Sequence, residues 1–201
     1  MKRLLLLAGL VLIPVQAAAQ DKPKAEVFGG YSYFHSDGGG NLNGWNASAS
    51  INLYKWIDVI ADFGGHYGSD SASITTSVIG FPNISVRANA DSSVHTFMGG
   101  PGFYLRTHSR FTPFTHFLFG AARVHSKGSF SATVGDLVNN IDFSITDTGF
   151  AMAIGGGLDL KITDSFALRL IQPDYLLARV GRNNQSNARI SAGIVFRFGS
   201  R

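Results

Sequence analysis

The chain has 201 residues, of which 45% are hydrophobic and 12% aromatic, so it can build one domain with a sizeable core and is not a disordered chain. Only 15% of its residues are charged, and a formal net charge of +4 without a cluster of Lys or Arg argues against nucleic acid as a partner. Soluble domains average about 25% charged residues, so this sequence lacks the charge that normally meets water.

The N-terminal segment has the features of a cleavable secretory signal. Lys2 and Arg3 precede an apolar run over 4–15, and Ala17 and Ala19 form a small-residue cleavage site. We therefore expect a signal peptide over residues 1–19 and a single mature domain over 20–201. The apolar run is shorter than the about 20 residues that a membrane-spanning helix needs.

After the signal come segments in which apolar and polar residues alternate, the period of a β-strand with unlike faces. The first is 25–34. In the second, 45–54, the odd-numbered residues from Trp45 to Leu53 are apolar, and the even-numbered ones are Asn or Ser. The third, 57–67, carries Asp58 and Asp62 on its polar face.

Five further segments bring the number of predicted strands to eight. They are 94–105, 113–125, 150–161, 166 to about 178, and 188–198. Both faces of 94–105 and 113–125 are largely apolar, so the alternation does not fix which face points inward. Pro173 cannot donate to a sheet ladder, so we expect the alternation to slip near it.

The connections between these segments are alternately long and short. The long ones are 35–43, 69–92, 127–147 and 180–187, and the short ones are 55–56, 107–110 and 163–165. In an up-and-down meander all the long loops lie at one end. We therefore predict an all-β fold, an antiparallel up-and-down barrel of eight strands, and the ends of the long loops could extend the strands.

Alternation alone does not say whether the apolar face points inward, as in a soluble lipocalin-like barrel, or outward into lipid. The polar faces consist mostly of Gly, Ser, Asn and Ala, which would make a poor soluble surface. Inside a narrow barrel, these small residues leave room for a few ionic side chains. We therefore predict a transmembrane barrel with a lumenal charge network of Glu26, Asp62, Asp159, Arg169, Arg189 and Arg197.

The placement of aromatic residues also favours the membrane, because amphipathic rings prefer the two water–lipid interfaces. Expected near the long loops are Tyr31, Tyr33, Trp45, Tyr67, Phe150 and Tyr175. Expected near the short turns are Tyr54, Trp56, Tyr104, Phe111, Phe166, Phe196 and Phe198.

With these features the chain, from about Ala25 to Arg201, resembles the small eight-stranded OmpA-like outer-membrane barrels. Its closing "VFRF", residues 195–198, resembles the C-terminal aromatic strand of that family. The resemblance implies a protein of the cell outer membrane that contacts outer-membrane lipid. It also implies insertion by the barrel-assembly machinery, with Phe196 and Phe198 as the recognised signal.

The interior of an eight-stranded barrel is filled by side chains, so we expect the charge network to be structural rather than an ion path. Adjacent residues such as His35 and Ser36 point to opposite faces of a strand, which argues against a catalytic dyad. We find no cofactor-binding or metal-ligating pattern. The expected role is non-enzymatic, either in envelope integrity or in binding an extracellular ligand through the surface loops. A small-solute or ion channel, a lipid-modifying barrel enzyme and a soluble lipocalin-like binder remain alternatives.

Overall fold

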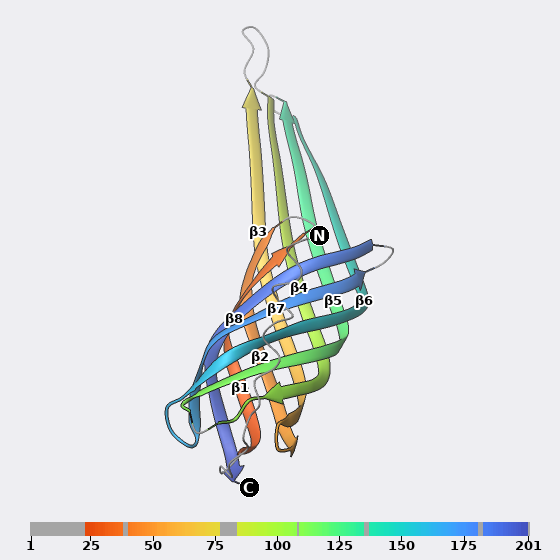
Figure 1. The fold of residues 1–201 in the computed structure, drawn as a ribbon. Helices are drawn as coiled ribbons and strands as arrows, with labels where there is room; N and C mark the ends of the chain where they lie inside the picture. Colours follow the sequence, from red (N-terminus) through yellow and green to blue (C-terminus); the bar gives the residue numbers. More distant parts are fainter. Residues whose placement is uncertain are drawn as a thin grey trace, which may run out of the picture.

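The structure, a computed structural model, describes residues 23–37, 40–76, 84–107, 109–134, 137–180 and 183–200, nearly all of them in strands (Figure 1). In chain order the strands are β1 (Pro23–Ser36), β2 (Asn41–Tyr54), β3 (Ile57–Thr76), β4 (Ile84–Tyr104), β5 (Phe111–Val134), β6 (Leu137–Lys161), β7 (Phe166–Val180) and β8 (Asn183–Ser200). Each pairs antiparallel with the next, and β1 pairs with β8 to close the barrel. The predicted eight-stranded barrel is confirmed. The predicted signal over 1–19 lies outside the described residues. In the part of the chain that the structure describes, no helix is long and apolar enough to cross a membrane.

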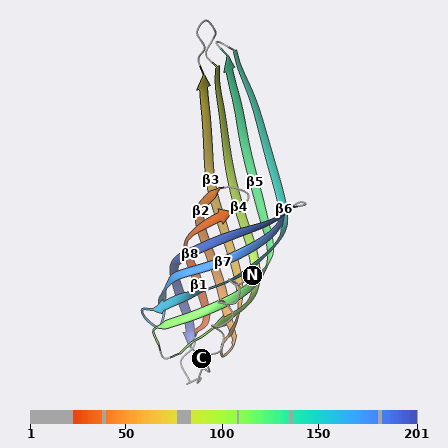
Figure 2. The same cartoon turned by 45° about the horizontal axis from the view of Figure 1, so that its top comes forward.

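Four strands extend into the segments predicted as long loops, as the sequence allowed, but they do so over far more of each segment than expected. The segments 69–92 and 127–147 are mostly paired strand, up to the pairs Thr76–Ile84 and Val134–Leu137. As a result β3, β4, β5 and β6 rise far beyond the other strands in both views (Figures 1 and 2). We call this part, Gly68–Thr76, 84–93, 125–134 and 137–148, the extension. The other two predicted long loops are also short, because β1 ends at Ser36 before β2 begins at Asn41, and β7 ends at Val180 before β8 begins at Asn183.

The pairing register fixes the two strands whose inward face the sequence left open. In β4 the even-numbered residues point into the barrel, as the burial of Val94, Thr96 and Met98 shows. In β5 the even-numbered residues also point inward, among them Leu118, which is completely buried. The slip expected near Pro173 occurs just before it, between Arg169 and Gln172 in the pairing of β7 with β8.

The barrel interior holds more large apolar side chains than predicted. A buried cluster inside it includes Phe34, Leu42, Ile60, Val94, Met98, Tyr104, Phe114, Leu118 and Leu176. Tyr104 was predicted to sit in the ring of aromatics near the short turns, and this is wrong. It lies on the inward-facing parity of β4, where the guanidinium of Arg106 stacks over its ring at 4.4 Å.

The other predicted interface aromatics lie on the outer face of the barrel. Exposed there are Tyr31, Trp45, Tyr67, Phe150 and Tyr175 toward the extension, and Tyr54, Trp56, Phe111, Phe196 and Phe198 toward the short turns. Tyr33 and Phe166 are partly buried. An apolar outer face flanked by aromatics is the surface that a membrane barrel presents to lipid.

Candidate functional site

Three arginines cross the lumen at successive levels, because each contacts residues on strands that are not its neighbours. The first is Arg106, in the connection after β4. Its Nη2 lies 2.7 Å from Asp58 Oδ2 on β3 and 3.4 Å from Glu26 Oε1 on β1. Glu26 is also 3.2 Å from Nε of Arg197, its direct register partner on β8. Two arginines thus share one buried glutamate at the short-turn end.

The second crossing is made by Arg169 on β7. Its Nε and Nη2 donate to the two carboxylate oxygens of Asp159 at 2.8 and 3.1 Å, and its Nη1 donates to Gln172 at 2.7 Å. The guanidinium lies between two rings, 4.4 Å from that of Phe28 and 4.2 Å from that of Phe114. A bidentate carboxylate and two aromatic faces satisfy a buried arginine well.

The third crossing is made by Arg189 on β8, which is completely buried. Its Nη1 donates to Asp62 Oδ1 on β3 at 2.8 Å, and its Nε donates to Asp174 Oδ2 on β7 at 2.8 Å. Asp174 also contacts His116 Nε2 at 2.8 Å and accepts from Gln172 Nε2 at 2.9 Å. Gln172 therefore connects this level with the one around Arg169.

Gly155 on β6 makes room for this network. A Cβ placed on it would overlap the Oδ1 atom of Asp174 and the backbone oxygen of Pro173. The absence of a side chain at Gly155 thus leaves space for the Asp174 carboxylate, its register partner on β7.

All six charged residues predicted for the lumen lie inside it and are paired. Sequence reasoning did not assign to the network several residues of the three levels, namely Asp58, Arg106, His116, Gln172 and Asp174. Asp58 was on the predicted polar face of its strand and carried a usable signal. His116 lies in a strand of undetermined phase, Gln172 and Asp174 flank Pro173 where the phase slips, and Arg106 lies outside any predicted strand.

One histidine and two serines form a buried chain beside this network. His66 Nε2 lies 2.8 Å from Ser32 Oγ, to which Ser191 Oγ donates at 2.9 Å, and all three side chains are almost completely buried. The chain joins β1, β3 and β8. Two other histidines that are each followed by a serine in the sequence have different partners, since His35 contacts Asn41 and His125 contacts Thr146. His108 lies outside the described residues, within which no cluster of three metal-ligating side chains occurs.

In the extension the polarity of the two sheet faces is reversed relative to the barrel. The register from β3 to β6 continues without a shift, so each face of the extension continues one face of the barrel wall. On the face that continues the lumen, one row joins Ala72, Ala88, Phe130 and Ile141. On the face that continues the lipid-facing surface, the next row joins Ser71, Asn89, Ser129 and Asp142. The reversal of polarity begins just beyond the outward-facing pair of Phe63 and Phe97, because the next outward-facing residues on β4 and β5 are His95 and Arg123.

The apolar face of the extension is exposed. The exposed fraction is 63% for Ile141 and 78% for Leu137, and Ile74, Phe143 and Ile145 are also more than half exposed. Surfaces of this kind mark interaction sites, because isolated proteins rarely leave contiguous apolar patches in water. The outer face is rich in Ser, Thr and Asn.

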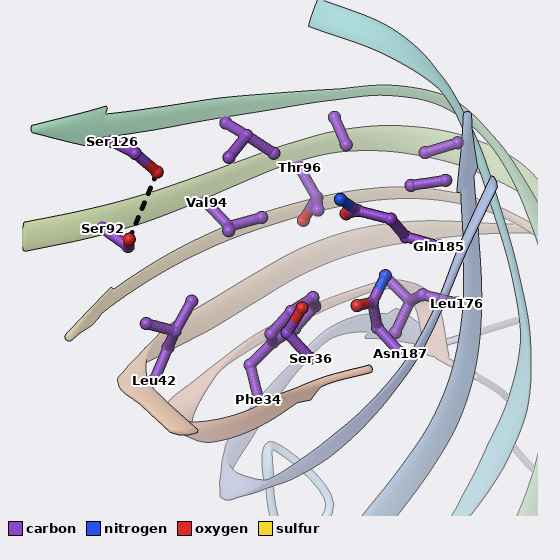
Figure 3. Close-up of a pocket in the computed structure, with 14 residues that line it drawn as sticks. Phe34, Ser36, Leu42, Ser92, Val94, Thr96, Ser126, Leu176, Gln185 and Asn187 are labelled. Atoms are coloured by element: carbon purple, nitrogen blue, oxygen red, sulfur yellow. Dashed lines mark hydrogen bonds between the residues drawn. The ribbon is translucent and has the colours of Figure 1, made fainter. Parts of the chain in front are cut away.

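This apolar face leads down to a cavity of about 200 Å³ at the mouth of the barrel. Its lining comes from β1, β2, β4, β5, β6, β7 and β8 and includes Phe34, Leu42, Val94, Val124 and Leu176 (Figure 3). Its polar lining includes Thr96, Gln185 and Asn187. The hydroxyls of Ser92 and Ser126, 3.2 Å apart, lie at its upper edge on β4 and β5.

Comparison with known proteins agrees with this architecture. Residues 5–198 match the family described as "Outer membrane protein beta-barrel domain". Among solved structures, Ail, the attachment invasion locus protein of Yersinia pestis, is 16% identical with a TM-score of 0.52, over 88% of this chain and 99% of Ail. Ail in complex with the heparin analogue sucrose octasulfate gives 20% identity and a TM-score of 0.54 over the same shares. OprG of Pseudomonas aeruginosa is 10% identical with a TM-score of 0.47, over 90% of this chain and 98% of OprG. A search of curated proteins found no significant match.

Proposed function

This chain belongs to the outer membrane protein β-barrel domain family, and on that premise we propose that it is a non-enzymatic, closed barrel that binds apolar material at the cell surface. The observation that carries the proposal is the reversal of polarity between barrel and extension. In outer-membrane barrels the longer connections face the cell exterior, which is the end where β3, β4, β5 and β6 extend about 30 Å beyond Tyr67 and its neighbours.

The reversal supports binding because it runs against what solubility requires. A sheet that stands in water next to a membrane is stable with polar side chains on both faces. Here the face with Phe130, Ile141 and Phe143 instead carries most of the exposed large apolar residues of the extension, and the opposite face is mostly polar. An apolar partner that covers this face would gain the full hydrophobic free energy of burial.

The experiment uses intact cells that display the protein. The residues 70–90 and 128–143 are each replaced by an Asn-Gly turn, which joins Ser69 to Asp91 and Lys127 to Ser144, pairs that already lie opposite each other. Cells with the parent protein are expected to be retained on octyl-coated beads, and cells with the trimmed barrel to be retained several-fold less.

A pair of adjacent substitutions provides the control for this experiment. Ile141→Ser lies on the apolar face and should lower retention, whereas Asn140→Ser on the polar face should leave it unchanged. Equal retention of parent and trimmed cells, at equal surface display, would overturn the proposal.

The ion pairs inside the lumen argue against the alternative function, a small-solute or ion channel. Within the described residues, the arginines at the three levels are each paired with a buried carboxylate, and moving them aside would leave buried carboxylates without a cation. We therefore expect the purified protein to give no stable current in planar bilayers. Large and reproducible conductance steps would contradict this expectation and favour a transport role.

For export and insertion we propose the route that the sequence suggests. Residues 1–19 act as a cleaved signal, 20–201 form the mature domain, and Phe196 and Phe198 act as the signal for the barrel-assembly machinery. In support, both phenylalanines are about half exposed on the outer face of β8, the last strand to close the barrel.

A further inference from the structure

The cavity at the barrel mouth has two buried polar atoms that nothing else in the described chain satisfies. Thr96 on β4 and Asn187 on β8 are almost completely buried, and within the described residues Thr96 Oγ1 and Asn187 Oδ1 have no hydrogen-bond partner. Both residues line the cavity, and the amide of Asn187 points into it (Figure 3). Buried polar atoms in native proteins are nearly always paired, so such exceptions need an explanation.

The surroundings of Thr96 set what charge a ligand can carry. A Cβ placed on Gly64 would lie 2.6 Å from Thr96 Oγ1 and 3.3 Å from Arg189 Nη1, so the cavity floor rests directly on the uppermost level of the ionic network. Arg189 is already held by Asp62 and Asp174. The floor therefore has no cation to offer a carboxylate, which would in addition face the Asn187 oxygen.

We propose that this cavity binds a small, uncharged amphiphile with an aliphatic body and a single hydroxyl head. The hydroxyl donates to Asn187 Oδ1 and accepts from Thr96 Oγ1, and the body lies against Phe34, Leu42, Val94, Val124 and Leu176. The inference rests on the proposed function, because it takes the apolar face of the extension as the route by which such a molecule reaches the mouth.

The volume limits the size of the ligand. Engineered apolar cavities of about 150 Å³ hold a benzene molecule, so a cavity of about 200 Å³ suits a body of about six to eight carbons. A concave site with mostly apolar walls and a few convergent polar atoms is also the usual form of a small-molecule site.

The test compares two isomers, hexan-1-ol and 1-methoxypentane, which have the same atoms but differ in the O–H donor. The full barrel in lipid nanodiscs carries isotope labels in its Leu and Val methyl groups. Hexan-1-ol should cause saturable shifts at Val94, Val124, Leu42 and Leu176, with weaker binding of the ether by about tenfold. Methyl groups of Val59 and Leu168, exposed on the outer face, report partitioning into lipid and should respond linearly.

Two variants separate the hydroxyl contact from the cavity itself. Thr96→Val keeps the shape and removes an unpaired buried hydroxyl, so the barrel should fold at least as well. Because both isomers can accept a hydrogen bond from Thr96, the affinity for each should fall about tenfold, while the preference for hexan-1-ol, which rests on its donation to Asn187, should remain. Val124→Phe fills the mouth and should abolish saturable binding of both isomers.

Equal affinities for the two isomers, or the absence of saturable shifts at the cavity methyls, would overturn the inference. The retention of cells on octyl-coated beads depends on the extension and should not change in Thr96→Val. A failure of this inference is therefore distinguishable from a failure of the proposed function.

Discussion

Arg189→Met is expected to lower the free energy of unfolding by about 3–5 kcal/mol. The side chain is completely buried and joins Asp62 on β3 to Asp174 on β7. Methionine fills a similar volume, so the loss comes mainly from two buried carboxylates that no longer have their cation. Asp174 keeps its contacts with His116 and Gln172, but among the described residues Asp62 keeps only the hydrogen bond that the amide of Asn46 donates.

The measurement is urea-induced unfolding in lipid vesicles, with folding followed by the heat-modifiable gel shift. Arg179→Met removes an exposed arginine from the neighbouring strand and should change the stability by no more than about 0.5 kcal/mol. Adding Asp62→Asn and Asp174→Asn to Arg189→Met removes all three charges and should restore most of the lost stability. A loss of under about 1 kcal/mol in the single variant, or a triple variant no more stable than the single one, would show that the ion pairs do not hold the barrel together.

The membrane-spanning part of the fold was predictable because lipid imposes a strict pattern on each strand. In β2, for example, every outward residue from Trp45 to Leu53 is apolar or small, and every inward one is Asn or Ser. One apolar face and one polar face leave only two possible orientations, and the low charge of the polar face decides between them.

Only the ends of the long connections were expected to extend the strands, and the full length of the extension was not predicted because its composition is typical of loops. The stretch SDSASITT, residues 69–76, is rich in Ser and Thr, yet it alternates, and its even-numbered residues face the same side as the lumen. In β3 the apolar residues Phe63 and Tyr67 are odd-numbered and lie on the outer face, whereas Ile74 is even-numbered and lies on the face that continues the lumen. This switch from odd to even positions could be read from the sequence. The signal was present, but short polar side chains do not distinguish a strand above the membrane from a loop.

The lumenal network was only half predictable, for a different reason. The acidic and basic residues that lie in clean alternation, such as Glu26 and Arg197, can be assigned to the lumen by counting. Asp174 and Gln172 follow a β-bulge, and a one-residue shift moves every later side chain to the other face. Arg106 reaches the lumen from a connection, where no periodicity exists to place it.

The orientation of the two faces is most directly tested on β8. Ile194 lies on the outward face between Ile190 and Phe198, and it pairs with Gly29 of β1 and Leu168 of β7. Ile194→Arg places a charge on the lipid-facing surface near mid-membrane and should destabilise the barrel by about 2–4 kcal/mol. Ile194→Leu, which keeps the volume and the polarity, should cost less than about 1.5 kcal/mol.

Arg197→Gln, on the inward face of the same strand, should cost less than Ile194→Arg. Arg197 is buried beside Glu26, but Glu26 also has Arg106 at 3.4 Å, so the carboxylate keeps one cation, and glutamine still offers a donor. We expect a loss of about 1 kcal/mol, the size of a single hydrogen bond. Both variants are compared by folding into lipid vesicles and by the heat-modifiable shift. If Ile194→Arg folds as well as the parent while Arg197→Gln does not fold, the apolar face of the barrel points inward and the protein does not present it to lipid.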